Sequence, residues 1–194
     1  MFNIEDRNTL WSLGNHDYAD TDRIQSYTKR PPYYATYQDE ITFIVLDTQD
    51  SLSNIVNNQK DFLFEVLDTI QQSKHLIVLH HKLIWMYDHD VLESQISSVS
   101  NADLGGCFNC INPNNFYSEI YPKLVDISDR GIKVLCIGGD IGYNTKEFEY
   151  LTNEGIYFLA SGINSNVDDN KAILFYHDLL NNHLKWSSAL LKDL

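Results

Sequence analysis

Three apolar runs that each end in polar or glycine residues constrain the fold of this chain most strongly. They are residues 41–46 (ITFIVL), 75–79 (HLIVL) and 132–137 (IKVLCI), whose length and β-branched content predict buried strands. Between them, apolar residues recur at helical spacing in residues 57–73 and 116–130, so each interval is expected to hold an amphipathic helix. The pattern predicts an α/β fold, in which ligand sites collect beyond the carboxyl ends of the strands.

The remaining segments fit around this frame. A polar stretch at residues 19–32 predicts a loop or a short helix, and residues 86–115 predict a long loop. Further strands are expected at residues 11–13 (the end of a strand), 33–37 and 155–162, and an antiparallel pair at 172–176 and 184–191.

Composition limits the class of protein. The chain has 194 residues, of which 43% are hydrophobic and 21% charged, so one globular domain is expected. The formal net charge of −13 argues against nucleic acid and anionic membranes as partners, because both need a basic surface. No apolar stretch is long enough to cross a membrane and no signal peptide opens the sequence, which makes a cytoplasmic location the default expectation.

The tetrapeptide Gly14-Asn15-His16-Asp17 carries the first candidate chemistry. Asn15 can offer its amide oxygen to a divalent metal ion, and His16 can give a proton to a phosphate oxygen or a leaving group. Asp17 can hold an imidazole in one orientation, while Gly14 permits a tight turn. The alternative is a polar turn with a surface histidine.

Two more groups follow the buried runs. His80 and His81 come directly after residues 75–79, and Asp140 follows residues 132–137. An imidazole placed there can bind a metal ion, but an adjacent pair can equally consist of one buried, hydrogen-bonded ring and one exposed ring. Asp47, after residues 41–46, can orient a site residue or cap a turn.

The three cysteines do not predict a metal site. Cys107 and Cys110 form a single CxxC without a second pair, so a structural zinc ion would lack ligands, and a local disulfide or two free thiols are the better readings. Cys136 lies in an apolar run and is expected in the core.

Taken in order, these motifs resemble the calcineurin-like metallophosphoesterases, relatives of the purple acid phosphatases. The resemblance spans about residues 11–176 and rests on the segments LGNHDY, PPYYATY, ITFIVLDT, LIVLHHKLIW and VLCIGGDIGYN. It implies a β sandwich flanked by helices that holds two divalent metal ions, such as Mn, Fe or Zn. In that family the metals activate water to attack the phosphorus of a phosphomonoester or phosphodiester.

The resemblance also implies roles for individual residues. Asn15 would bind the second metal ion, and His16 would contact the phosphate or the leaving group. His80 would be a metal ligand in preference to His81, because the family usually has the ligand first in this pair. Asp140 would replace the first histidine of the family's GH-x-H motif as an oxygen ligand.

The sequence departs from the family at both ends of the metal site. The D-x-H and GD-x-x-D motifs come before GNHD in the family, but only 14 residues precede Asn15 here, and Gly142 stands where the second histidine of GH-x-H belongs. Residues 1–194 are therefore expected to form a C-terminal portion of the domain that lacks its first β-α-β segment. Exposed strand surface would then need a missing N-terminal segment or a second chain to cover it.

The expected function is metal-dependent hydrolysis of a small phosphate ester, with activity in doubt for this chain alone. One alternative is a non-catalytic remnant of the fold that binds another protein. Another is a mononuclear site built on His80 and Asp140 that performs a different hydrolysis.

Overall fold

A six-stranded sheet forms the centre of the molecule. The computed structural model describes residue 6 and residues 8–17, 21–102, 110–164 and 167–194. Among these, the strands of the sheet lie in the order β1-β2-β3-β4-β6-β5. Their bounds are β1 Tyr34–Gln38, β2 Ile41–Val45, β3 His75–His80, β4 Lys133–Gly138, β5 Glu147–Leu151 and β6 Tyr157–Ser161.

The sheet is mixed, with a parallel centre. Strands β2, β3, β4 and β6 run parallel, whereas β1 and β5 pair antiparallel at the two edges. The central strands are nearly continuous apolar runs because both of their faces are covered. The parallel register brings the carboxyl ends of β2, β3 and β4 to one edge of the sheet.

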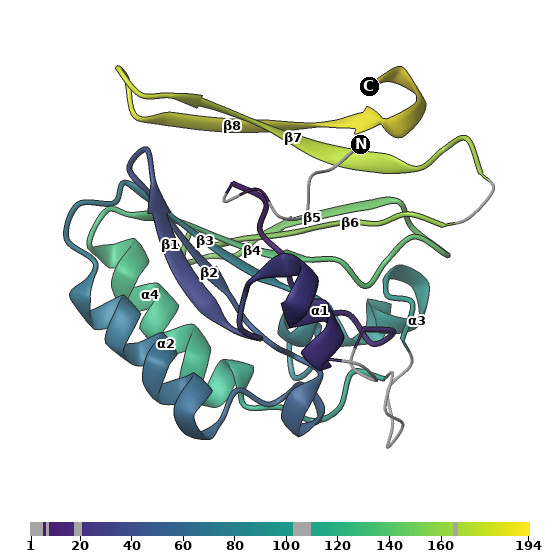
Figure 1. Ribbon diagram of the computed structural model, residues 1–194, viewed down its shortest axis with the longest axis horizontal. Coiled ribbons are helices and arrows are strands. Elements are labelled where there is room, and N and C mark those ends of the chain that lie inside the picture. Colours follow the sequence, from purple (N-terminus) through teal and green to yellow (C-terminus); the bar gives the residue numbers. More distant parts are fainter. Residues whose placement is uncertain (1–5, 7, 18–20, 103–109, 165–166) are drawn as a thin grey trace.

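The two long helices α2 (Asn57–Thr69) and α4 (Tyr121–Asp129) cover one face of the sheet (Figure 1). The other described α-helices are α1 Thr21–Thr28, which lies to the side of them, and the short α3 Ile96–Val99, and a π-helical turn over Phe116–Ile120 precedes α4. Apolar residues of α2 and α4 pack on the helix side of β2, β3 and β4 and form the larger core, which includes Ile44, Leu63, Val78, Leu124 and Val134. None of the described helices is both long and apolar enough to cross a bilayer.

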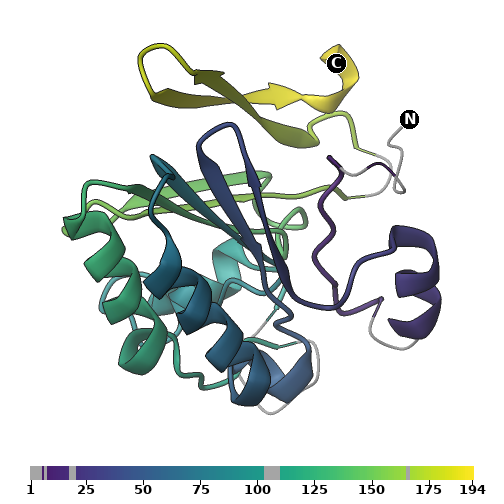
Figure 2. The ribbon, with the colours of Figure 1, turned by 60° about the vertical axis from the view of Figure 1, so that its left-hand side comes forward.

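A β-hairpin covers the opposite face (Figure 2). Strands β7 Lys171–Asp178 and β8 His183–Leu190 pair antiparallel in a separate two-stranded sheet. The hairpin packs on residues of the central strands to form a second, smaller core, which includes Ile41, Ile77, Leu135, Leu159 and Leu184. Phe43, Leu79 and Ile137 lie on the same face nearer the carboxyl ends and are only half-buried.

The α/β class, the strands of the central sheet other than β5, both long helices and the closing antiparallel pair were correctly predicted from the sequence. The strand end expected at Trp11–Leu13 is wrong, since this segment makes no ladder and is instead held by side-chain hydroxyls: the Trp11 N–H donates to Tyr34 Oη at 2.7 Å, and Ser12 Oγ donates to the Leu46 carbonyl at 3.3 Å. Residues 19–32 contain α1, and the described part of residues 86–115 includes the short α3.

The two described cysteines differ in whether they form a disulfide. Cys110 is disulfide-bonded, which agrees with the local disulfide expected for the CxxC, although Cys107 lies outside the described residues. Cys136 is a free, buried thiol of β4, as expected for a core residue.

Candidate functional site

The loops that follow β3 and β4 are bound to each other at the carboxyl edge of the sheet. The carbonyl of His81 accepts hydrogen bonds from the backbone N–H groups of both Gly139 and Asp140, each at 3.0 Å. Asp140 is held further by Asn101 and Ser100, whose backbone N–H and hydroxyl donate to its carbonyl. The two candidate side chains His81 and Asp140 are thereby fixed next to each other.

Three predicted site residues converge here, and we call them the Asn15–His81–Asp140 cluster. His81 Nε2 lies 2.8 Å from Asn15 Oδ1 and 3.6 Å from Asp140 Oδ1. Because an amide oxygen can only accept, Nε2 carries the proton and donates it to Asn15. The side chain of His81 is 20% exposed and that of Asp140 7%, so the cluster lies at the protein surface without being open to bulk water on all sides.

Two glycines make room for the His81 ring. A Cβ atom on Gly14 would lie 3.3 Å from Cε1 of the ring, and one on Gly139 would lie 3.6 Å from its Nδ1. Gly14 was expected to serve a tight turn through its backbone freedom, but its φ is not in the left-handed region. The glycine is needed for the space beside the imidazole.

Asp17 closes the turn that carries Asn15. Its Oδ2 accepts the Gly14 N–H at 2.9 Å, and its own N–H donates to the Gly14 carbonyl at 3.0 Å. Burial lowers the pKa of His81 to about 4, and the Asp17 carboxylate opposes that change by stabilising the charged ring. Asp17 thus contributes negative charge to the cluster as well as shaping the turn.

His16 is exposed on the same turn. It lies close enough to the cluster to affect both of its titratable members, because its charge lowers the pKa values of His81 and Asp140. The side chain expected to face the substrate is therefore at the solvent side of the cluster.

His80 points elsewhere. It is 3% exposed, its Nδ1 donates to the Lys82 carbonyl at 2.7 Å, and its Nε2 is buried without a hydrogen-bond partner in the described part of the chain. Burial lowers the pKa of His80 to about 4, so the ring is neutral with its lone pair turned inward. The structure thus places His81, and not the preferred His80, beside Asn15 and Asp140.

Lys82 directly follows His81 and was not among the candidate site residues. It is fully buried at the end of β3, and its N–H donates to Thr48 Oγ1 at 3.0 Å. Burial lowers the pKa of its ammonium group, while Asp140 and then Asp47 stabilise the charged form. A buried lysine between carboxylates cannot be read from a single sequence, because nothing local reveals which strand ends flank it.

Asp47 caps a turn, which is one of the two roles expected for it from the sequence. Its Oδ1 accepts the backbone N–H groups of Gln49 at 2.8 Å and Asp50 at 3.3 Å. The Gln59 side chain from the first turn of α2 clamps the Asp47 backbone from both sides, since it donates to the carbonyl and accepts from the N–H. The carboxylate is consequently held at the end of β2, next to Lys82.

Position 142 has no room for a metal-ligating side chain in place of glycine. Its φ is +126°, and a Cβ atom there would lie 2.9 Å from both the N and the O of Ile163. A histidine at this position would need a strained backbone and would collide with the neighbouring loop. The second ligand of the family's GH-x-H motif is therefore excluded by packing.

The donor atoms of the cluster are of types that a divalent cation can bind, although His81 and Asn15 contact each other directly at 2.8 Å. The cluster offers an amide oxygen, an imidazole nitrogen and a carboxylate oxygen, a donor set suited to borderline metals such as Mn, Fe or Zn. The ring lies in a space that a Cβ on Gly14 would narrow, which is consistent with a fixed ligand. Among the described residues, however, no three His, Cys, Asp or Glu side chains are grouped closely enough to hold an ion.

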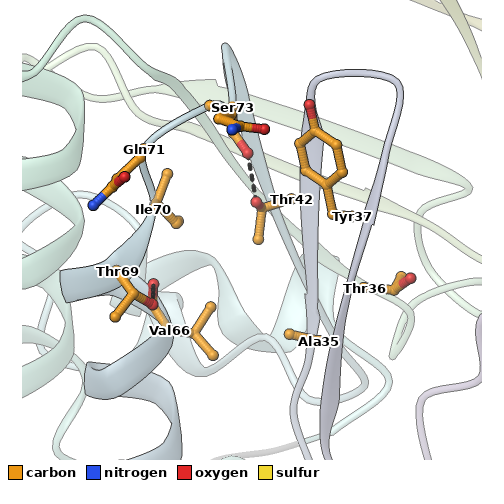
Figure 3. Close-up of a pocket in the computed structure, with 10 residues that line it drawn as sticks. Ala35, Thr36, Tyr37, Thr42, Val66, Thr69, Ile70, Gln71 and Ser73 are labelled. Atoms are coloured by element: carbon orange, nitrogen blue, oxygen red, sulfur yellow. Dashed lines mark hydrogen bonds between the residues drawn. The ribbon is translucent and has the colours of Figure 1, made fainter.

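A groove of about 400 Å³ lies at the other end of the sheet (Figure 3). Its walls come from β1, the start of β2 and the C-terminal end of α2, and include Tyr37, Thr42, Val66 and Ile70. Thr42 and Ser73 share a hydrogen bond of 2.5 Å on its floor. Since Thr42 lies near the amino end of β2, the groove is distant from the Asn15–His81–Asp140 cluster.

Comparison with known proteins adds no family to this description, since no protein-family model matches the chain and no curated protein shows significant similarity to it.

Proposed function

We propose that this chain is part of a metal-dependent phosphoesterase of the calcineurin-like type, acting on a small phosphomonoester or phosphodiester. The observation that carries the proposal is the convergence of Asn15, His81 and Asp140 at the carboxyl ends of the central strands, with His16 exposed beside them. Four candidates separated by up to 125 positions would not gather at one edge of a sheet by local sequence preference alone.

Asn15, His81 and Asp140 would hold the metal ion. A divalent cation bound there supplies positive charge to a phosphoryl oxygen and makes water a stronger nucleophile at neutral pH. For His81 to become a ligand, the proton on Nε2 must move to Nδ1, and the hydrogen bond to Asn15 then gives way to two separate metal contacts. The hydrogen bond keeps both donors in position without the metal.

His16 would handle the proton of the reaction. An exposed imidazole beside the cluster can donate a proton to the departing alkoxide, which lowers the barrier for a poor leaving group. Asp17 would act indirectly, because its carboxylate holds the turn that carries both Asn15 and His16.

The experiment is an assay of aryl phosphates with Mn²⁺, Fe²⁺ or Zn²⁺. We expect metal-dependent hydrolysis by the wild type, and a loss of about 10²-fold or more in kcat in His16→Ala with folding retained. His183→Ala, at an exposed position of the hairpin, is the matched control and should keep full activity. Full activity in His16→Ala would remove the assigned role.

A second candidate function is a non-catalytic remnant that binds another protein. It is favoured by the half-buried Phe43, Leu79 and Ile137 on the hairpin side of the sheet, a surface that a second chain would cover. Elemental analysis separates the two candidates: less than about one tenth of a metal ion per chain after reconstitution favours the remnant.

A further inference from the structure

A second cavity, of about 340 Å³, lies on the helix side of the sheet next to β5. It is bounded by the loop over residues 88–91, the π-helical turn, the first residue of α4, and the end of β5 with the turn that follows. Its volume is in the range of sites that hold small molecules. No member of the Asn15–His81–Asp140 cluster lines it, so it is a separate feature of the molecule.

Aromatic rings form much of the wall of this cavity. The His89 ring lies 5.6 Å from that of Tyr117 and meets the ring of Tyr150 edge to face at 5.1 Å, measured between centroids. Tyr117 in turn contacts Tyr121 at 5.1 Å, and its hydroxyl donates to the Trp85 carbonyl at 2.7 Å. The four lining rings are half-buried, so they offer a fixed apolar surface that a ligand can still reach.

His89 is held in its uncharged form. Its Nδ1 accepts the backbone N–H groups of Val91 at 3.1 Å and Leu92 at 3.3 Å, which places the proton of the ring on Nε2. Burial lowers the pKa of His89, although Asp90 and then Glu154 oppose this by stabilising the charged ring. A neutral imidazole does not repel a cation that enters the cavity.

Three exposed carboxylates surround these rings, and we call Asp88, Asp90 and Glu154 the rim carboxylates. The first two belong to the loop over residues 88–91, and Glu154 to the turn after β5. Glu154 Oε2 accepts the Tyr121 hydroxyl at 2.6 Å, and this hydrogen bond lowers the pKa of the carboxyl group. Among the described residues that line the cavity, none is a lysine or an arginine. The cavity therefore combines apolar walls with a negatively charged rim.

We propose that this cavity binds an aliphatic diamine. Its methylene groups lie against the aromatic rings, which also attract ammonium groups, and its two ammonium groups donate to rim carboxylates of the two segments. A metal ion is the poorer occupant, because no three His, Cys, Asp or Glu side chains of the described residues are grouped closely enough to hold one. An elongated cation can reach carboxylates that stand apart. This inference does not depend on the proposed phosphoesterase function.

The test titrates the protein with putrescine by calorimetry at about 50 mM salt, where exposed charges are weakly screened. We expect saturable binding by the wild type. The double variant Asp90→Asn/Glu154→Gln should bind putrescine about five-fold more weakly or worse, because two exposed ion pairs with the ligand are lost. Glutamine at position 154 can still accept the Tyr121 hydroxyl, so the wall is retained.

Asp39→Asn is the matched control for charge. Asp39 is also exposed, but it lies in the turn between β1 and β2, at the other edge of the sheet. Its φ of 51° suits asparagine, so the turn should be unaffected. Putrescine affinity should stay within about two-fold of the wild type, since one distant exposed charge is screened. Equal weakening in Asp39→Asn and the double variant would overturn the proposal.

A pair of substitutions at position 150 tests the aromatic wall. Tyr150→Phe keeps the ring and should bind putrescine as the wild type does. Tyr150→Val keeps a residue that favours strands but removes the ring, and should bind about three-fold more weakly or worse. Equal affinity in folded Tyr150→Phe and Tyr150→Val would contradict the proposal. If Tyr150→Val does not fold, the double variant decides alone, because it changes only exposed side chains.

Mg²⁺ separates recognition of a diamine from simple attraction of positive charge. It carries the same charge as putrescine but has no methylene groups and no N–H donors, so it should bind at least about five-fold more weakly. Binding of Mg²⁺ as tight as that of putrescine, or no saturable putrescine binding by the wild type, would overturn the inference.

Discussion

At the scale of single residues, Gly142 decides whether a metal-ligating side chain could stand two residues after Asp140. Gly142→His should destabilise the protein by about 1–3 kcal/mol and should add no metal ion, because φ is +126° and the new Cβ would lie 2.9 Å from the Ile163 backbone. Urea unfolding and metal counting check both parts. The control is Gly131→Ala, where φ is +82° but no atom lies within 4 Å of the added Cβ. Its cost should be smaller, about 1 kcal/mol. A stable Gly142→His variant with an additional bound ion would contradict the packing argument.

A substitution at Gly14 tests whether the position of the His81 ring matters for metal binding. A Cβ there would lie 3.3 Å from the imidazole Cε1 and 3.4 Å from Asp17 Oδ2, so the ring or the turn must shift by a few tenths of an ångström. Gly14→Ala should therefore weaken Mn²⁺ binding by several-fold while changing the free energy of unfolding by less than about 1 kcal/mol. Calorimetric titration and urea unfolding of the same samples measure the two effects. Unchanged affinity would mean that His81 is not a ligand.

At the scale of elements, the hairpin is joined to the sheet by a pair of histidines. The ring of His75 on β3 meets that of His177 on β7 edge to face, with centroids 5.0 Å apart, and the ring nitrogens are shielded from water. Burial lowers the pKa of His75 to about 4, and His177, Lys133 on β4 and His183 on β8 add to the effect, whereas the Asn182 backbone opposes it.

The pH dependence follows from the sign of this shift. Because the folded pKa of His75 lies below the unfolded value of about 6.5, the unfolded chain binds the proton first. The contribution is fully present above pH 6.5 and is lost as the pH falls from there toward 4. His75→Phe should lose about 1 kcal/mol less stability than the wild type between pH 7 and pH 5, as measured by urea unfolding. Tyr176→Phe, at an exposed position of β7, should keep the wild-type slope. Equal slopes in all three proteins would contradict the prediction.

The elements also show how far the sequence alone can reach. The apolar runs that end at Leu46, Leu79 and Ile137 can be recognised as strands from the sequence alone. A strand that is buried on both faces needs an almost continuous run of apolar residues. Strand β5 (EFEYL) was not predicted, although Glu147 and Glu149 alternate with apolar residues. Which of His80 and His81 contacts Asn15 depends on the direction in which each ring projects at the end of β3. Which carboxylates lie near Lys82 depends on the order of the strands in the sheet. Neither is a property of local sequence.

At the scale of the whole molecule, the two edges of the central sheet differ in their protection. Strand β5 carries Glu147 and Glu149, which bind Lys171 and the Trp186 indole from the hairpin. Strand β1 has no charged residue, pairs with β2 alone among the described strands, and exposes Tyr37 at 52%. An uncharged edge with free backbone groups can pair with another chain. The net charge of −13 opposes such association over longer distances.

Self-association through β1 should therefore increase with the salt concentration and should be suppressed by one charged side chain added to this strand. Raising the ionic strength to about 0.5 M shortens the range of the repulsion, so sedimentation velocity should reveal larger species in the wild type. Tyr37→Lys should suppress these species with little change in the free energy of unfolding, because the side chain is exposed and a lysine on an edge strand disfavours pairing. Leu151→Lys, equally exposed on the charged β5 edge, is the matched control and should associate as the wild type does. If both lysines act alike, added charge rather than the β1 edge governs association. If neither acts, the contact between copies lies elsewhere, and the half-buried Phe43, Leu79 and Ile137 are then the next surface to change.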